Sequence, residues 1–483
     1  MKVSLVNPNL SGDVSILDIG ITYLCTFINQ KTRHKANIID FTFHRRNWEN
    51  HLFNQLEKQK PDVLGISATS LYMSYCKKII LSAQKKFPSL RIIMGGWHCS
   101  IEPEDSINNY PFVEAIVIGD GEFALNEYLD HIEKNESLEG VRGIWFKDKT
   151  GNIIKNEKRP FIQNIDDLPI PDYDYWEDLD KYFFYNQMLY FMGNRGCPFA
   201  CTFCSESVIK KNVPGPHLRF RNPQLFAQEI RYQYDKYRNR GLRIAHFFDP
   251  VFPHHKDWLK EFVHEYIRIG LAKELPFSCF TRVDTIDQER IELLASANCK
   301  IMRIGIEAGN EYVRKQIYKK NISNQKYAEV IPLLHKNGIC VTGFNMLGGP
   351  SETRKTLQDT FRLVKNLQID RPIFFTYRPL PKTRAAELVF ELGGKIHDWV
   401  HIDSYHKKSN ISTPYLKPGD ILFFRYKCLF YFTFKRTIKL IRKQKFRFLI
   451  NLLKYISHGI RDGVGLEYAI GYFYVCAGDN LLE

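Results

Sequence analysis

Long apolar runs are missing from this sequence. No stretch approaches the roughly 20 consecutive apolar residues that a membrane-spanning helix requires. The N-terminus, Met1 to Val6, has the pattern of a strand and lacks the apolar core and small-residue cleavage site of a signal peptide. Internal repeats and low-complexity segments are missing as well. These absences predict a globular cytoplasmic protein, whose 483 residues suffice for about two to four domains.

A disulfide framework is missing too. The sequence contains 11 cysteines, and three of them lie together between Cys197 and Cys204. We interpret most of the others as small core residues, namely Cys25, Cys76, Cys99, Cys279, Cys299, Cys340, Cys428 and Cys476. A tight group of cysteines in a cytoplasmic enzyme favours metal binding over disulfide formation.

Acidic residues are scarce near the C-terminus. The chain as a whole has 68 basic and 53 acidic residues, a net charge of +15, which allows nucleic acid, anionic lipid or an acidic substrate. From Pro418 to Arg461 eleven Lys or Arg residues accompany a single acid, Asp420, among many aromatic and aliphatic residues. We interpret residues 395–483 as a basic helical region. It could contact a membrane surface and accept a lipid substrate, but we favour a helical lid with a solvated basic face and a buried aromatic face.

Strand and helix patterns alternate over residues 1–135, which predicts a doubly wound parallel sheet. The expected strands are short apolar runs: Lys2–Val6, Ala36–Asp40, Val63–Ser67, Arg91–Met94 and Ala115–Ile118. The expected helices are Ile19–Gln30, Trp48–Lys58, Ser70–Lys86 and Glu122–Glu133.

Small and flexible residues follow four of these strands. The segments are Asn7-Pro8-Asn9, Ser67-Ala68-Thr69, Gly95-Gly96-Trp97-His98 and Gly119-Asp120-Gly121-Glu122. Ligands of doubly wound sheets bind beyond the carboxyl ends of the strands. A large flat ligand could therefore approach the backbone at this edge.

A second alternating region follows a connector over residues 136–185. The connector contains a hairpin signal at Lys147–Asn152 and an acidic, proline-bearing segment at Asp166–Asp174. Over residues 186–394 six strand–helix units predict a parallel sheet rolled into a full or partial barrel. Its expected strands are Met188–Gly193, Ile244–Phe248, Phe277–Thr281, Ile301–Ile306, Val341–Met346 and Ile373–Tyr377.

The most informative motif follows the first strand of this second region. Cys197, Cys201 and Cys204 form the pattern C-x3-C-x2-C, with Phe203 before the last cysteine. Three thiolates leave one iron of a [4Fe-4S] cluster without a protein ligand, so that iron can bind a cofactor. The alternative is a zinc site, which normally has four protein ligands in two pairs. No fourth ligand is evident nearby, although His217 stays open as a candidate.

This motif resembles that of the radical S-adenosylmethionine (SAM) superfamily, and further segments extend the resemblance in order. They are His246–Phe252, Gly305–Gly309, Gly343–Thr353 and Tyr377–Thr383. The resemblance implies that SAM binds the open iron and is reduced to a 5′-deoxyadenosyl radical, with an electron donor such as flavodoxin or ferredoxin. It places Phe203 beside the adenine and implies SAM contacts for Asp249 and Glu307. Their simpler interpretations are a helix cap for Asp249 and a strand-end salt bridge for Glu307.

Residues 1–135 resemble the cobalamin-binding domain that precedes the radical domain in one large branch of this superfamily. The implied cobalamin contacts are Asn7, Ser67, Thr69, Gly95, Gly96, His98, Gly119, Gly121 and Glu122. Asn9 and Asp120 depart from the common pattern, and the cobalt-ligating motif Asp-x-His-x-x-Gly is absent, as is usual in this branch. We expect His98 to contact the corrin periphery or to pack locally. The alternative is a domain that has lost its corrin.

The combined resemblance implies a radical SAM enzyme, with methylation of an unactivated carbon as the leading hypothesis. One SAM would supply the radical and a second the methyl group, through cobalamin, to a small-molecule, natural-product or lipid substrate. The first alternative is a cobalamin-dependent cyclase, oxidase or rearrangement enzyme. The others are a transfer-RNA methylthiotransferase with a second cluster on Cys25, Cys76 and Cys99, and a non-catalytic cobalamin- or cluster-binding regulator. We do not expect nucleic acid as a partner, and the sequence identifies no catalytic side chain.

Overall fold

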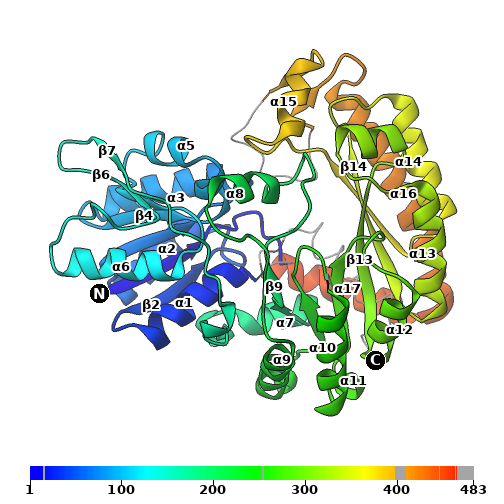
Figure 1. Ribbon diagram of the computed structural model, residues 1–483, viewed down its shortest axis with the longest axis horizontal. Helices are drawn as coiled ribbons and strands as arrows, with labels where there is room; N and C mark the ends of the chain where they lie inside the picture. The colour runs from blue at the N-terminus through cyan, green and yellow to red at the C-terminus, as the bar shows by residue number, and fades with distance from the viewer. Residues whose placement is uncertain (15–16, 253–254, 398–408, 445, 463, 465–483) are drawn as a thin grey trace.

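Two large parallel sheets organise the computed structural model, which describes residues 1–14, 17–252, 255–397, 409–444, 446–462 and 464 (Figure 1). The first sheet, coloured blue to cyan, lies on one side of the molecule, and the second, coloured green to yellow, lies on the other. Helices cover both. The prediction of an α/β protein with an N-terminal sheet domain, a central barrel and a helical C-terminal region is confirmed.

The N-terminal sheet has the strand order β2-β1-β3-β4-β5, followed by β6 and β7. Its parallel strands are β1 (Lys2–Asn7), β2 (Lys35–Asp40), β3 (Val63–Ser67), β4 (Arg91–Gly95) and β5 (Ala115–Val117). Its helices are α1 (Ile19–Lys31), α2 (Trp48–Gln59), α3 (Met73–Lys86), α4 (Trp97–Ile101), α5 (Pro103–Asn108) and α6 (Glu122–Glu133). The strand order reverses between β1 and β3, and a ligand crevice opens at such a switch point.

The predicted connector contributes to this sheet. Its hairpin consists of β6 (Ile144–Lys147) and β7 (Ile153–Lys155), and β6 pairs antiparallel with β5. Trp145 lies opposite Ile116 in this pairing. The hairpin covers the edge of β5, whose backbone groups would otherwise be unpaired. The first sheet therefore continues past residue 135.

The central sheet is a partial barrel with the order β15-β14-β13-β12-β11-β8. Its strands are β8 (Met188–Phe191), β11 (Ile244–Phe247), β12 (Phe277–Thr281), β13 (Cys299–Glu307), β14 (Cys340–Leu347) and β15 (Arg371–Thr376). The helices outside it are α9 (Pro223–Tyr237), α10 (Lys256–Arg268), α12 (Gln288–Ser296), α13 (Asn324–Lys336) and α14 (Arg354–Asn366). All six strands lie where the sequence predicts them. The order ends at β8 and β15, so the barrel remains open.

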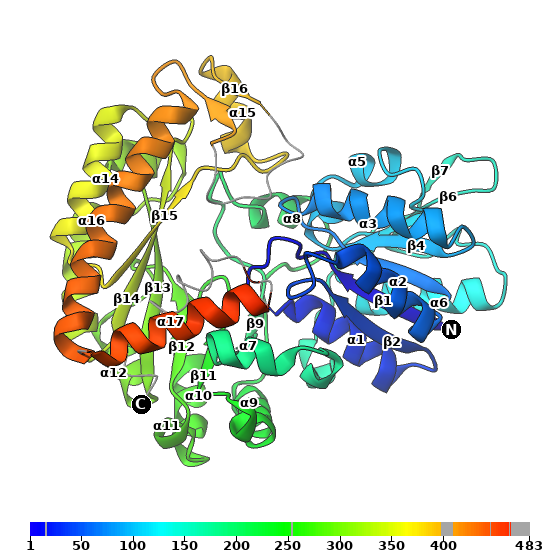
Figure 2. The ribbon, with the colours of Figure 1, turned by 180° about the vertical axis from the view of Figure 1, so that it is seen from behind.

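Two helices near the C-terminus, α16 (Pro418–Gln444) and α17 (Phe446–Arg461), return the chain to its middle (Figure 2). On α16, Phe432 stacks on Phe374 of β15 at 5.5 Å. On α17, Tyr455 stacks at 5.3 Å on Phe184 of α7 (Leu179–Asn186).

The aromatic residues of α16 are only partly buried, whereas the expected lid has a buried aromatic face. Phe432 is half-buried against the barrel, but Phe423 and Phe430 are 74% and 76% exposed. The aromatic residues are therefore divided between a packed and a solvent-facing side. No helix among the described residues is long and apolar enough to cross a membrane.

Candidate functional site

The cysteine loop leaves the carboxyl end of β8, the first strand of the barrel. It begins with β9 (Asn194–Arg195), which pairs antiparallel with β10 (Arg219–Phe220). Gly196 then turns the chain with φ of +85°, and a Cβ there would lie 2.1 Å from the carbonyl oxygen of His217. Only glycine fits this position. The close approach of the two segments thus fixes where the first cysteine emerges.

Backbone contacts hold the cysteine loop from two sides. Thr202 donates from its amide to the carbonyl of Tyr318 at 3.2 Å and from its hydroxyl to that of Ile317 at 2.6 Å. On the other side, the amide of Ala385 donates to the carbonyl of Thr202 at 3.0 Å. Ala385 belongs to α15 (Arg384–Glu391), which follows the last barrel strand. Segments that follow β13 in the middle of the barrel sheet and β15 at its edge therefore position the loop.

The three predicted ligand thiols, Cys197, Cys201 and Cys204, are half-buried. Within the described part of the chain, the group of metal-ligating atoms that all lie within 4.8 Å of one another is His34, Asp130 and Glu133, so the thiols are spread more widely. A single zinc ion with Zn–S bonds of about 2.3 Å would bring neighbouring sulfurs to about 3.8 Å. The wider spacing fits separate irons of a cluster.

His217, the open candidate for a fourth zinc ligand, is engaged through one ring nitrogen, whereas its Nδ1 is buried without a hydrogen-bond partner among the described residues. It is buried, and its Nε2 lies 2.5 Å from Oε2 of Glu206. The ring orientation is therefore set by Glu206 rather than by the cysteines. The zinc alternative gains no support from it.

One basic side chain reaches the cysteines directly. Arg282 donates from Nη1 to Sγ of Cys201 at 3.5 Å, and its guanidinium lies 3.7 Å from the ring centre of Phe199. Asp284 orients it through an ion pair of 2.7 Å. A cation beside the sulfur favours the thiolate, which burial alone disfavours by raising the pKa of the thiol, as for Cys197 to about 11. Arg282 could not be predicted from the sequence, because no local pattern marks it.

Glu307 is the last residue of β13 and has an unusual backbone conformation. Its φ is +64°, in the left-handed region, and the pairing with β14 shifts register between Gly305 and Glu307. Lys320 donates to Oε1 of Glu307 at 3.0 Å and to the carbonyl of Gly305 at 2.6 Å. The salt bridge considered as its simpler role is thus present. Strained residues of this kind cluster at functional sites, and the SAM contact stays a prediction.

Phe203 lies at the mouth of the barrel. Its ring is half-buried, meets Tyr318 edge-on at 5.2 Å and packs near Met346, at the end of β14. An apolar ring held in this way offers a partly free face to a flat base. Its place beside adenine stays a prediction that the geometry allows.

Two fully buried carboxylates hold the turns around the barrel mouth. Asp249 accepts from the amides of Gly193 at 3.2 Å and Asn194 at 2.5 Å, and so fixes the start of the cysteine loop. Helix α10 begins at Lys256, so Asp249 does not cap it and the cap interpretation was wrong. Burial raises the pKa of Asp249 to about 7. Its predicted SAM contact stays untested beside this positioning role.

The second carboxylate, Glu352, gives a testable pH dependence. It accepts from the amides of Gly348 at 2.6 Å and Gly349 at 2.9 Å, and burial raises its pKa from 4.5 to about 7. The folded state therefore binds this proton more tightly than the unfolded state. Protonated Glu352 therefore stabilises the folded state, fully below pH 4.5, and this contribution is lost as the pH rises to about 7. The loss amounts to at most about 3 kcal/mol.

Replacing Glu352 by Gln keeps a hydrogen-bond acceptor and removes this ionisation. We expect the drop in melting temperature between pH 5 and pH 8, followed by circular dichroism, to be smaller in the Glu352→Gln variant than in the wild type. Glu289→Gln, at an exposed position, serves as the control and should leave the slope unchanged. Equal slopes in all three proteins would contradict the assignment.

The predicted cobalamin residues lie together along the carboxyl edge of the first sheet. At the switch point, Asn7 donates to Asp40 at 2.9 Å and Ser67 donates to Asp18 at 3.1 Å. Two glycines have positive φ, Gly96 at +98° and Gly119 at +87°, and a Cβ on Gly96 would lie 2.9 Å from the carbonyl oxygen of Ala68.

The remaining residues of this edge are close by. The amide of Ala68 donates to the carbonyl of Gly95 at 2.7 Å, and Gly121 immediately precedes α6. The Thr69 hydroxyl is enclosed and has no hydrogen-bond partner among the described residues, and glycines stand at the strand ends. Both features fit a ligand with polar groups at its edge that lies across these strand ends. Their cobalamin contacts stay a prediction.

His98 packs locally, which was one of its two expected roles. Its Nδ1 lies 2.9 Å from the Ser70 hydroxyl, and its Nε2 lies 3.2 Å from Asp105. The side chain is buried. With both nitrogens engaged inside the domain, His98 offers no nitrogen to a cobalt ion.

Glu122 and Asp120 make the contact that joins the two sheets. Arg195, two residues before Cys197, donates to Glu122 at 2.7 Å and to Asp120 at 3.3 Å. Arg219 of β10 donates to the other oxygen of Asp120 at 2.5 Å. All four side chains are largely buried. The predicted cobalamin residue Glu122 thus faces the cysteine loop. No local sequence pattern marks Arg195 or Arg219 as its partners.

The second cluster of a methylthiotransferase gains no support. Cys76 and Cys99 belong to one apolar core, whereas Cys25 belongs to the other core of the structure. All three are fully buried. One cluster could not be held by cysteines from separate cores.

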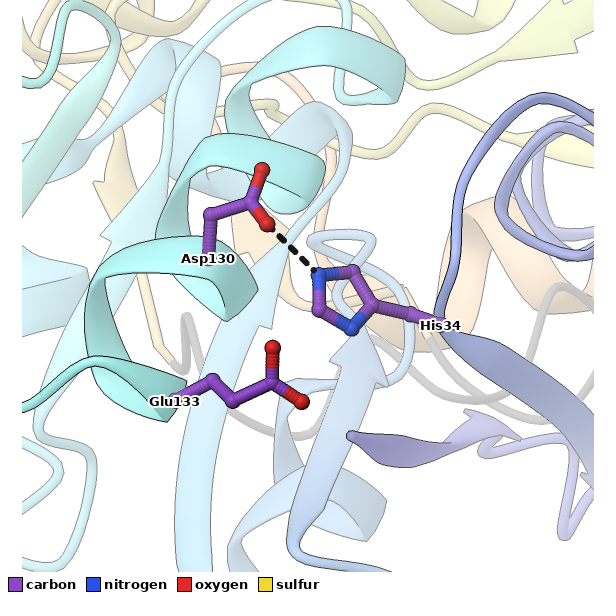
Figure 3. Close-up of side chains that lie close together, drawn as sticks. All are labelled: His34, Asp130 and Glu133. Atoms are coloured by element: carbon purple, nitrogen blue, oxygen red, sulfur yellow. Dashed lines mark hydrogen bonds and ion pairs between the residues drawn. The ribbon is translucent and has the colours of Figure 1, made fainter.

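A polar cluster of another kind lies at the opposite edge of the first sheet (Figure 3). His34 lies 3.2 Å from Asp130 of α6, and Arg33 forms ion pairs with Asp130 at 2.8 Å and Glu133 at 2.7 Å. The amino group of Met1 lies 2.9 Å from Nδ1 of His34. These cations balance the two carboxylates, so the cluster fastens α6 to β1 and β2 without requiring a metal ion.

Comparisons with known proteins point to two domains. The family model of the radical SAM superfamily matches residues 193–364, and that of the B12 binding domain matches residues 11–129. An uncharacterized methyltransferase, PH0819, from Pyrococcus horikoshii is 28% identical over 80% of this chain and 83% of its own. The anaerobic magnesium-protoporphyrin IX monomethyl ester cyclase of Cereibacter sphaeroides is 25% identical over 97% of this chain and 76% of its own.

Two solved structures share the architecture. The radical SAM methyltransferase TsrM from Kitasatospora setae has a TM-score of 0.68 at 18% identity and covers 80% of this chain and 77% of its own. The cobalamin-dependent radical enzyme OxsB has a TM-score of 0.64 at 17% identity and covers 81% of this chain and 55% of its own. These similarities show that the whole arrangement of sheet, barrel and connecting segments occurs in other proteins.

Proposed function

Because the chain belongs to the B12-binding radical SAM superfamily, with methyltransferases and cyclases among its relatives, we propose that it methylates an unactivated carbon of a small molecule. One observation carries the proposal. Glu122 and Asp120, at the edge assigned to cobalamin, form ion pairs with Arg195 of the cysteine loop. The two proposed cofactor sites therefore face each other, as a methyl transfer between them requires.

The barrel side prepares SAM for cleavage. We assign Cys197, Cys201 and Cys204 to three irons of a [4Fe-4S] cluster, with Arg282 stabilising the thiolate of Cys201. Glu307, fixed by Lys320, would hydrogen-bond SAM at the end of β13. When bound, the cluster supplies the electron that cleaves SAM reductively, and cobalamin carries the methyl group. Asp249 keeps the loop in place through two backbone amides.

The sheet side is suited to a corrin without a histidine below the cobalt. Gly96 and Gly119 form tight turns at the strand ends, where a Cβ would meet the Ala68 backbone or the Val213 side chain, and the Thr69 hydroxyl has no hydrogen-bond partner among the described residues. Both ring nitrogens of His98 are occupied by hydrogen bonds to Ser70 and Asp105. Because His98 is held by these two residues, it would not supply a nitrogen to a bound cobalamin, which would serve as the carrier of the methyl group from SAM.

A methyl-transfer experiment tests this assignment. The anaerobically purified and reconstituted protein, with hydroxocobalamin, a reductant and SAM labelled in its methyl group, should bind about one corrin per chain. The labelled methyl group should appear in the corrin fraction, and S-adenosylhomocysteine should form as the unlabelled product. We expect a His98→Asn variant to give the same visible spectrum and the same labelling, because His98 does not reach the cobalt.

Other outcomes distinguish the alternatives. Corrin binding without labelling would favour radical cyclisation, which the cyclase relative aligned over 97% of the chain makes the second candidate. A spectrum that changes in His98→Asn would show that this histidine is a ligand after all. A cluster that forms without any corrin binding would remove cobalamin-dependent methylation.

A further inference from the structure

Side chains on the inner face of the barrel are fully buried at His246 and Ser278, but aromatic rings further along the strands are only half-buried. On the outer face, Phe247 of β11 and Phe277 of β12 pack on Phe262 of α10 at 5.6 Å and 6.5 Å, and all three are fully buried. Successive side chains of a strand point to opposite faces. Phe280 of β12, and Phe248 at the end of β11, therefore face inward, and both are half-buried.

Aromatic rings continue around this inner face. Phe248 and Phe280 lie 5.9 Å apart, Phe280 and Phe344 of β14 lie 5.8 Å apart, and Phe344 and Phe375 of β15 stack at 5.9 Å with an angle of 8°. Phe344 and Phe375 are half-buried as well. A closed barrel normally fills its interior with packed side chains. Here four rings present accessible surface that suits a flat apolar molecule.

A single guanidinium lies among these rings. Arg303 belongs to β13, and its guanidinium is 5.7 Å from the ring centre of Phe280. It donates from Nη2 to the sulfur of Met188 at 3.9 Å, and Met188 is on β8, three strands away in the sheet order. The side chain therefore crosses the concave face of the sheet. A thioether is a weak acceptor.

Among the described residues, no ion pair joins Arg303 to a carboxylate. Its Nε is enclosed without a hydrogen-bond partner in this part of the chain. The buried His246, whose Nδ1 lies 2.7 Å from the Ser278 hydroxyl, also lies near Arg303, and burial together with the charge of Arg303 holds the pKa of His246 well below 6.5. A largely enclosed cation without a partner is costly, and an anionic ligand would offset that cost.

We propose that the inside of the barrel binds a substrate with a flat, apolar body and a carboxylate that pairs with Arg303. The planar fork of a guanidinium matches a carboxylate with two parallel hydrogen bonds. The four phenylalanines hold the body of the substrate through their ring faces. This substrate class rests on the proposed function, because it takes the barrel interior as the place where the methyl acceptor binds.

Equilibrium dialysis of the reconstituted full chain against 2-naphthoate and the neutral 2-naphthamide tests the proposal. The wild type should bind the carboxylate about tenfold more tightly than the amide. The Arg303→Met variant should lose this preference while it keeps its affinity for the amide. Lys300→Met removes an exposed cation from the same strand and serves as the matched control, which should keep the preference.

Iron content and 5′-deoxyadenosine formation, measured on the same samples, separate the two proposals. Loss of iron and of 5′-deoxyadenosine formation in the wild type would count against the proposed radical function, not against the proposed role of Arg303 in substrate binding. Normal iron and cleavage with equal binding of both probes would overturn the substrate class, and so would a preference that survives in Arg303→Met. If Arg303→Met does not fold, Arg303→Lys should keep and Arg303→Gln should lose the preference for the carboxylate.

Discussion

Replacing Cys197, Cys201 and Cys204 together by alanine is expected to remove the protein-bound iron and to abolish reductive cleavage of SAM. The wild type should reconstitute to about four irons per chain, because a cubane held by three thiolates contains four. Without these ligands the loop keeps its backbone contacts through Thr202 and still folds. Iron and sulfide analysis, the visible spectrum and 5′-deoxyadenosine formation report the result.

The control for the cysteine variant is Cys340→Ala. Cys340 is half-buried at the start of β14, at the end of the barrel opposite to the loop. The Cys340→Ala variant should keep iron content and SAM cleavage at the wild-type level. Iron retained by the triple variant, or stoichiometric zinc in the wild type, would disprove the cluster assignment.

Replacing Arg195 by Met is expected to uncouple the two domains. The variant leaves Glu122 and, in part, Asp120 buried without their counter-charge, which typically costs about 3 to 5 kcal/mol. Because the cysteines themselves are untouched, iron content and SAM cleavage should fall much less than transfer of the labelled methyl group to corrin. The measurement is the ratio of S-adenosylhomocysteine to 5′-deoxyadenosine, together with the free energy of unfolding.

A double-mutant cycle shows whether the effect belongs to this ion pair. Glu122→Gln and Arg195→Met should be non-additive by about 1 to 3 kcal/mol. Arg142→Met breaks an exposed pair with Glu157 inside the first domain and should cost no more than about 1 kcal/mol. Additive effects, or an unchanged product ratio in Arg195→Met, would show that the pair does not couple the sites.

The sheet and barrel could be predicted because each strand carries its own signal. All six barrel strands, from β8 to β15, were expected from short apolar runs separated by helical periodicity. The hairpin of β6 and β7 was also recognised, but its pairing with β5 was not. Local patterns show that a strand exists, whereas the partner of an edge strand depends on the folded sheet.

The candidate site was predictable to a different degree for each residue. The spacing of the three cysteines and the glycine before them is a local property, so Cys197, Cys201 and Cys204 could be named directly. Asp249 was named for a cofactor contact, yet it also binds backbone amides 55 and 56 residues away in the chain. The role of Glu122 was likewise incomplete without Arg195.

By itself the sequence determined the class of the protein: two alternating α/β regions, a three-cysteine loop and a glycine-rich strand edge. Only the tertiary structure decided which charges meet, such as Glu122 with Arg195, 73 residues apart, and which cation has no carboxylate partner among the described residues, as for Arg303. The physical reason is the distance along the chain over which each kind of signal acts. Hydrophobic periodicity and cysteine spacing act within a few residues, whereas burial and ion pairing depend on how distant segments pack.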